Sequence, residues 1–171
     1  MEHYDTENEI WFVFPTKASG EKALSYNDAV EEALCFGWID GRAGTLDEMH
    51  SIRRFTPRRR GSSYSRPNIE RLIWLEERGL LLPEVREEVL PLIREPFVFP
   101  EDILDELKKD AVVWENYRSF SLPYRRIRIA YIDAARKRPA EFVKRLNSFI
   151  ARTRQNRLIT GYGGIDRYYG R

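Results

Sequence analysis

The chain has 171 residues, of which 42% are hydrophobic and 33% charged, a balance that is typical of a soluble globular protein. A chain of this length buries enough surface to fold without a metal or disulfide framework, and the single cysteine, Cys35, excludes an internal disulfide and a cysteine-based zinc site. The formal net charge is only +2, which argues against a uniformly basic, polyanion-binding protein.

The amino terminus carries no targeting signal that we can identify. Its first ten residues, MEHYDTENEI, are polar and acidic, without the basic start and apolar run of a secretory signal. No stretch approaches the roughly 20 apolar residues that a transmembrane helix needs. We therefore expect a cytoplasmic protein without membrane insertion.

The first third of the chain predicts a small sheet with one covering helix. Residues 10–14, IWFVF, are typical of a buried strand. Ser25 is a good N-cap for a helix that Gly37 would end in a left-handed conformation. Residues 38–44 and 51–56 then form two strands of an antiparallel hairpin stopped by a proline. Together these segments predict a sheet of about three strands.

The sequence after Arg66 has mostly helical patterns. Pro67 opens a helix that Gly79 closes, and Pro83 opens another that we expect to be interrupted at Pro91. The glycine- and tyrosine-rich tail has no helical pattern. The remaining expected elements are, in chain order, a rigid connector PFVFP at 96–100, a short helix from Pro100, a turn capped by Asp110, and longer helices at 121–137 and about 139–154.

Residues 53–66, RRFTPRRRGSSYSR, carry six arginines and no acid. Guanidinium groups suit carboxylates and phosphates through two-pronged hydrogen bonds, while the serines and rings of this segment supply further donors and stacking faces. The pattern favours an anion site or a nucleic-acid contact. A plainer alternative stays open: a solvated basic loop neutralised by acids such as Glu84, Glu87 and Glu88.

The segment GWIDG, residues 37–41, precedes this run and brackets Asp40 with two glycines that allow a sharp bend. Three roles for Asp40 are open. It could act as a general base, accept backbone hydrogen bonds in a turn, or fix an arginine such as Arg54 in a partly buried pair.

Other reactive side chains carry weaker signals. Cys35 lies at the end of a helix, where the dipole does not favour a thiolate, so we expect a small buried hydrophobe. His50 stands beside Asp47 and Ser51, but no nucleophile-elbow motif or metal-ligand spacing accompanies it. Residues 161–164, GYGG, lack the lysine ending of a phosphate-binding loop. We expect no metal and no cofactor.

Several of these motifs together resemble the bacterial YdeI/OmpD-associated family, also called bacteriocin-protection proteins. They are ALCFGWIDG at 33–41, RFTPRR at 54–59 followed by S-x-x-S and an asparagine, the upstream K-x-S-G at 17–20, and the late NRLITGYGGI-x-x-YY at 156–169. The resemblance extends over nearly the whole chain. It implies a cytoplasmic bacterial protein linked to stress and to resistance to bacteriocins or cationic antimicrobial peptides, with no agreed enzymatic activity.

The sequence also departs from that family. Relatives commonly begin with an extra helix before the first strand, and we expect this sequence to be short there. The tryptophan of their S-x-W-S motif is Tyr64 here, and their S-K-x-N has become Ser65-Arg66-Pro67-Asn68. The stacking surface should survive the first replacement, whereas a lysine-specific role would not survive the second.

These observations predict an α+β protein: a small antiparallel sheet packed by a helix (domain 1–95), followed by a C-terminal helical region with a Gly/Tyr-rich tail (domain 96–171). The leading function is non-catalytic binding of an anionic small molecule or peptide. The alternatives are an enzyme with Asp40 as acid or base, and a nucleic-acid-binding module. The predicted ligand contacts are Trp38, Asp40, Arg42, Arg54, Arg58, Ser62, Tyr64 and Asn68.

Overall fold

The computed structural model describes residues 3–16, 18–21, 24–59, 61–160 and 165–168. Within these ranges the chain forms a three-stranded antiparallel sheet and seven α-helices, so the predicted α+β class with a helical C-terminal region is confirmed. The elements are β1 (Ile10–Pro15), α1 (Tyr26–Cys35), β2 (Trp38–Thr45), β3 (His50–Pro57), α2 (Arg66–Glu77), α3 (Pro83–Arg94), α4 (Glu101–Lys108), α5 (Ala111–Ser119), α6 (Leu122–Asp133), α7 (Pro139–Arg154) and a short 3₁₀ turn (Ile165–Tyr168).

The chain divides into two compact units. Unit 1 comprises Met1–Tyr64 and Arg71–Arg94, and unit 2 comprises Ser65–Glu70 and Glu95–Arg171. Unit 1 therefore holds the sheet with α1 and α3, and unit 2 holds α4 to α7, while α2 contributes to both. We describe each unit separately.

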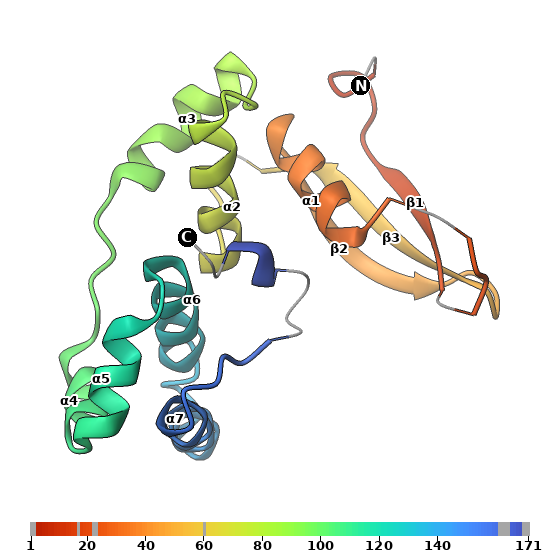
Figure 1. Ribbon diagram of the computed structural model, residues 1–171. Helices are drawn as coiled ribbons and strands as arrows, with labels where there is room; N and C mark the ends of the chain where they lie inside the picture. Colours follow the sequence, from red (N-terminus) through yellow and green to blue (C-terminus); the bar gives the residue numbers. More distant parts are fainter. Residues whose placement is uncertain (1–2, 17, 22–23, 60, 161–164, 169–171) are drawn as a thin grey trace. The chain divides into compact units, whose positions relative to one another are not determined.

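The sheet of unit 1 has the order β1-β3-β2, with both neighbouring pairs antiparallel. Helix α1 lies across one face of this sheet (Figure 1). It begins where predicted, because the Ser25 hydroxyl accepts a hydrogen bond from the Asp28 amide at 3.1 Å. It ends where predicted, because Gly37 adopts φ 71°, a conformation that glycine reaches without strain.

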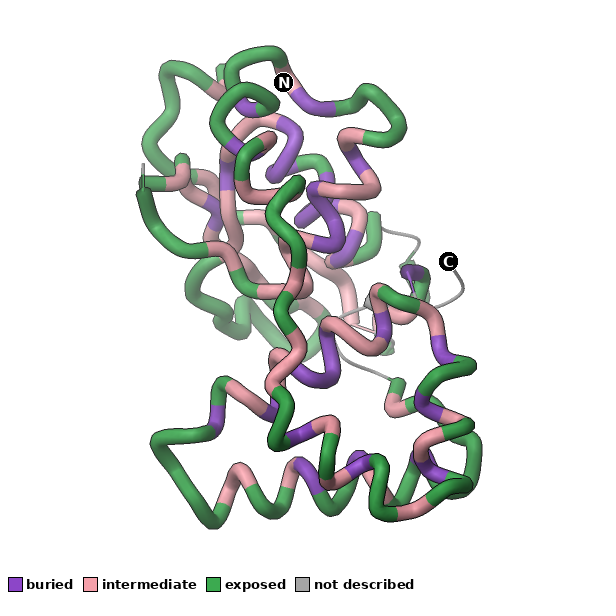
Figure 2. Tube along the Cα trace, turned by 90° about the vertical axis from the view of Figure 1, so that its left-hand side faces the viewer, coloured by how far each residue is buried: buried purple, intermediate pink, exposed green. Residues whose placement is uncertain are grey.

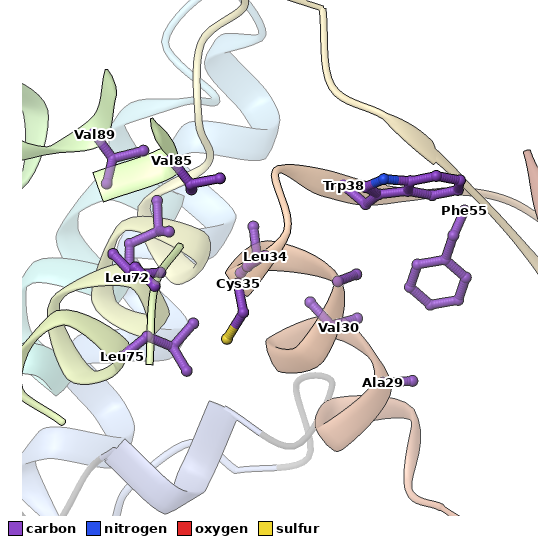
Figure 3. Close-up of a cluster of buried hydrophobic side chains, with 12 residues drawn as sticks. Ala29, Val30, Leu34, Cys35, Trp38, Phe55, Leu72, Leu75, Val85 and Val89 are labelled. Atoms are coloured by element: carbon purple, nitrogen blue, oxygen red, sulfur yellow. The ribbon is translucent and has the colours of Figure 1, made fainter. Parts of the chain in front are cut away.

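The core of unit 1 lies between α1, the sheet and the helices α2 and α3. Figure 3 shows Leu34 and Cys35 of α1 facing Leu72 and Leu75 of α2. At the other end of the cluster, Trp38 and Phe55 lie side by side in the same view, and both are only 2% exposed. Cys35 is thus a buried hydrophobe, and burial raises the pKa of its thiol to about 11.

The helices α4 to α7 of unit 2 carry buried residues interspersed with exposed ones (Figure 2). Asp110 caps α5 as predicted, accepting hydrogen bonds from the amides of Val112 and Val113. Tyr124 of α6 and Phe149 of α7 pack together in the interior, with ring centroids 6.2 Å apart.

Two sequence-based expectations for the helical region were wrong. Pro91 does not interrupt its helix: α3 continues to Arg94, because a proline in the last turn removes one hydrogen bond without ending the helix. The tail is not devoid of helical structure, since Ile165–Tyr168 form a 3₁₀ turn in which Tyr168 is buried. The GYGG segment at 161–164 lies outside the described residues.

Candidate functional site

A polar cleft of about 430 Å³ opens in unit 1, on the sheet face that α1 covers and next to the start of that helix. Its walls come from the end of β1 and the loop after it, from the first residues of α1, and from facing positions of β2 and β3. The polar side chains that line it are Thr16, Glu21, Ser25, Tyr26, Ser51 and Arg53.

Strand alternation places Arg53 in this cleft. Arg53 and Phe55 are two residues apart on β3 and share the face covered by α1, whereas Arg54 is on the opposite face. Strand β2 has one extra residue where its pairing shifts between Asp40 and Ala43. Such a bulge redirects nearby side chains, and here Asp40 lies on the same face as Arg53.

The guanidinium of Arg53 is held on one side only. Its Nη1 donates to the carbonyl oxygen of Gly41 at 3.2 Å and lies 3.6 Å from Oδ2 of Asp40. Its carbon centre stands 4.7 Å from the centroid of the Tyr26 ring, a cation–π contact. The other edge of the group, formed by Nε and Nη2, makes no hydrogen bond to any residue that the structure describes.

Tyr26 fixes the carboxylate behind this arginine. Its hydroxyl donates to Oδ2 of Asp40 at 2.5 Å. Burial, followed by this hydrogen bond to Asp40, raises the pKa of Tyr26 to about 12, so the phenol stays protonated and remains a donor at neutral pH. The result is a fixed chain of contacts from Tyr26 to Asp40 to Arg53.

Two further features of the cleft supply hydrogen-bond donors. The hydroxyl oxygen of Thr16 is buried and has no hydrogen-bond partner among the described residues. The first turn of α1 begins at Ser25, and its amides carry partial positive charge that the Asp28 carboxylate in the same turn partly offsets. The carboxylate of Glu21 also lines the cleft and would repel an anion. This side chain is largely exposed, and its Oε1 lies 3.6 Å from Nε2 of His50.

The described residues that line the cleft include none of the eight predicted contacts. Asp40 contacts two of the residues that line the cleft, Tyr26 and Arg53. Trp38 is part of the core, where it is only 2% exposed, and its indole nitrogen donates to the carbonyl of Tyr4 at 2.9 Å.

Two of the predicted arginines lie in the hairpin strands, Arg42 in β2 and Arg54 in β3. Arg42 is exposed and makes no ion pair within the described part of the chain. Arg54 is on the other face of the sheet from Arg53, where its Nε donates to Oε2 of Glu9 at 2.7 Å.

Three of the predicted contacts after β3, Arg58, Ser62 and Tyr64, contact one another, although Nε of Arg58 is buried without a hydrogen-bond partner among the described residues. The guanidinium of Arg58 lies 3.4 Å above the centroid of the Tyr64 ring and donates to the carbonyl oxygen of Ser62. The hydroxyl of Ser62 in turn donates to the carbonyl of Arg59 at 2.7 Å. Asn68 belongs to unit 2, and Arg60 lies outside the described residues. A ligand-binding role for this cluster stays a prediction.

The histidine of the hairpin is paired with an acid but not with a nucleophile. Nδ1 of His50 lies 2.9 Å from Oδ1 of Asp47, while the Ser51 hydroxyl donates to the carbonyl of Phe14 at 3.3 Å. The described residues contain no group of three or more His, Cys, Asp or Glu side chains arranged to hold a metal ion.

The sequence contains a signal for the position of Arg53 that is independent of the charged run. Arg53 and the apolar Phe55 are two positions apart in a predicted strand, which places both on the covered face. Thr16 and Tyr26 gave no comparable signal, because only the folded sheet brings the loop after β1 to the start of α1.

Comparison with known protein families gives two matches. Residues 1–88 match the family described as a domain of unknown function (DUF8412), and residues 96–156 match the family described as "Bacteriocin-protection, YdeI or OmpD-Associated". The second match confirms the predicted resemblance, although the motifs that suggested it, at 33–41 and 54–59, fall within the first. No curated protein and no solved structure matches the chain. Among the described helices, none combines the length and the apolar character required to cross a membrane.

Proposed function

The chain belongs to the family described as a domain of unknown function (DUF8412), and we propose that its unit 1 binds a small anionic molecule in the cleft beside Arg53. The observation that carries this proposal is that only one side of the Arg53 guanidinium has hydrogen-bond and ring contacts among the described residues. Arg53 is anchored through Nη1 and the Tyr26 ring, while the edge formed by Nε and Nη2 has no hydrogen-bond partner in the described part of the protein.

That edge suits a carboxylate or a phosphate. Nε and Nη2 present two parallel N–H groups, the arrangement that binds two oxygens of one anion. About 29% of the Arg53 side chain is exposed, so an anion can reach the group while being partly shielded from water. Because the contacts with Tyr26 and Asp40 already fix the side chain, little conformational entropy is lost on binding.

Neighbouring groups support the same ligand class. The unpartnered hydroxyl of Thr16 can donate to an anionic oxygen, and the N-terminus of α1 adds favourable electrostatics. A volume of about 430 Å³ fits a small metabolite better than a folded peptide segment. In this proposal Asp40 is a positioning residue that orients Arg53.

The proposal is for binding without catalysis, in the cytoplasm. An enzyme using Asp40 as acid or base has less support, because that carboxylate accepts a hydrogen bond from Tyr26 and is absent from the cleft lining among the described residues. A nucleic-acid-binding module also has less support, because Arg53 and Arg54 are on opposite sheet faces and Arg58 is stacked on Tyr64.

We further propose that ligand binding contributes to the protection against bacteriocins that the description of the matched C-terminal family names, or to a stress response. The anion would then act as a signal or a cargo for the protein. This link rests on the family description alone and is separate from the cleft chemistry.

A thermal-shift experiment on the full chain tests the binding proposal. The probes are inorganic phosphate, succinate and adenosine monophosphate, with uncharged succinamide as the control. We expect at least one anion to raise Tm in a concentration-dependent manner, since a ligand of the folded state stabilises it. The rise should disappear in Arg53→Gln and persist in the matched Arg54→Gln. Equal shifts in both variants, or no shift with any anion, would contradict the proposal.

A further inference from the structure

We propose that unit 2 contains a second, independent site, a cleft between α6 and α7 that binds a small organic carboxylate carrying an apolar group. This cleft has a volume of about 250 Å³. It is built from one face of each helix, with Arg128, Tyr131 and Ile132 from α6 and Glu141, Lys144, Arg145, Ser148 and Phe149 from α7, and Ile159 completes it.

The charge of this cleft favours an anion. Three cationic side chains and one carboxylate line it. Glu141 pairs with Arg145, and Arg128 is buried with interactions of its own, so the exposed Lys144 is the cation that supplies the excess positive charge at the mouth of the cleft. A local positive potential of this kind concentrates anions even in a protein whose net charge is near zero.

An aromatic ring and two guanidiniums make this wall rigid. The guanidinium of Arg145 lies 3.8 Å from the centroid of the Tyr131 ring, and that of Arg128 lies 5.6 Å from it. Arg145 is also anchored through Nε to Glu141 at 2.8 Å and through Nη1 to the carbonyl of Tyr131 at 2.7 Å. Hydrogen bonding to Arg145 lowers the pKa of Glu141, so this carboxylate stays ionised and keeps Arg145 in place.

Two donors remain at the rim of the cleft. Lys144 and Ser148 are one helical turn apart on the exposed side of α7, and neither side chain hydrogen-bonds to a residue that the structure describes. An ammonium group and a hydroxyl at this spacing can bind the two oxygens of one carboxylate. The single charge of a carboxylate also meets less repulsion from Glu141 than a phosphate dianion would.

The floor of the cleft explains why the ligand needs an apolar part. Ile132 and Phe149 are buried there, and Ile159 is partly buried above Tyr124, to whose hydroxyl its amide donates at 3.0 Å. The accessible lining of the cleft is more apolar than polar, so an inorganic anion would leave apolar surface in contact with water, whereas an aromatic or branched carboxylate would cover it.

Amide chemical-shift titration of the full-length protein by NMR tests this inference. The probes are benzoate, benzyl alcohol, which has the ring without the charge, and inorganic phosphate, which has the charge without the ring. We expect benzoate to move the amide signals of residues 128–132 and 141–149 in a saturable manner. Benzyl alcohol and phosphate should bind these residues at least about tenfold more weakly, because each lacks one of the two contacts.

Matched lysine variants complete the test. Lys144→Gln should weaken benzoate binding about tenfold, the effect of losing one charge-assisted contact, whereas Lys137→Gln, an exposed lysine outside the cleft, should leave it unchanged. Unmoved amides in α6 and α7, equal binding of benzyl alcohol, or equal effects of the two substitutions would overturn the inference. Shifts confined to residues 14–16 and 51–53 would also overturn it, while supporting the cleft of unit 1.

Discussion

Arg53 in unit 1 and Arg66 in unit 2 are both partly buried arginines, but their surroundings differ in kind. Arg66 and Arg126 both bind Glu70, whose side chain is 2% exposed, through hydrogen bonds of 2.5 to 2.7 Å. Arg53 instead contacts the Tyr26 ring, the carbonyl oxygen of Gly41 and the Asp40 carboxylate. That carboxylate also accepts a hydrogen bond from the Tyr26 hydroxyl.

The comparison separates an arginine that serves the fold from one that is available to a ligand. Glu70 occupies the edge formed by Nε and Nη2 on both Arg66 and Arg126, so neither arginine can offer that edge to an external anion. Arg53 keeps two donors unused within the described part of the protein, at the wall of a cleft. Burial alone therefore does not distinguish these two arginines, and the proposed anion site depends on the edge of Arg53 formed by Nε and Nη2.

The largest expected effect is on stability and concerns unit 2. Glu70→Gln leaves Arg66 and Arg126 partly buried without a counter-charge, and we expect it to lower the free energy of unfolding by about 3 kcal/mol. Urea unfolding of the full chain, followed by circular dichroism, measures this. As the control, Glu76→Gln removes the more exposed pair with Arg86 and should cost less than about 1 kcal/mol. Equal losses would show that the Glu70 cluster has no special structural role.

The next effect is on ligand affinity and concerns unit 1. Arg53→Gln should weaken binding of the anion that gives the largest thermal shift by about 2–3 kcal/mol, or about 100-fold, because a charge-assisted pair is lost. Isothermal titration calorimetry measures the loss. Arg54→Gln should change affinity less than twofold, since Arg54 is paired with Glu9 on the other face. The distinction between the two kinds of arginine fails if Arg53→Gln binds normally.

A smaller effect on stability and on anion affinity is expected from removing the Tyr26 hydroxyl, which helps to position Arg53. Tyr26→Phe keeps the ring under the guanidinium but removes the hydroxyl that donates to Asp40. We expect the free energy of unfolding to fall by about 1 kcal/mol and the anion affinity to fall about fivefold, as Asp40 loses its orientation. Thermal and calorimetric measurements on one preparation give both values. An unchanged affinity would show that Asp40 does not position Arg53.

The smallest expected effect is the pH dependence of stability that arises from His50, at the start of β3. Hydrogen bonding to Asp47 raises the pKa of His50 above its ordinary value of 6.5. Because the folded-state pKa is the higher one, this pair stabilises the fold fully below about pH 6.5, and the contribution is lost as pH rises through the raised pKa. An NMR titration of His50 checks this. The pKa should fall towards 6.5 in Asp47→Asn, and an unshifted value would contradict the expected pairing.

Local signals explain what could be predicted from the sequence. Ser25, Gly37 and Asp110 act through neighbours within a few residues, so their helix ends were found correctly. Pro91 gave a wrong expectation because the cost of a proline depends on how near the helix end lies, and that end is set by packing.

The candidate site was harder to predict for a physical reason. The run of arginines predicts a single binding surface at residues 53–66, but side chains alternate along β3, so Arg53 and Arg54 lie on different faces of the sheet. Trp38, placed in the site on the basis of its glycine-flanked turn, is buried because its ring packs on Phe55. Thr16 is separated from Arg53 by 37 residues and is brought near it only by the pairing of β1 with β3.

The most direct test of the central claim observes the guanidinium of Arg53 itself. Arginine side-chain Nε–H signals can be recorded by NMR in the full-length protein, with those of Arg53, Arg54 and Arg58 assigned through single lysine substitutions. On addition of succinate or phosphate, the signal of Arg53 should move and saturate, while those of Arg54 and Arg58 stay in place. A fixed Arg53 signal, or equal movement of all three, would contradict the assignment of the cleft as an anion site.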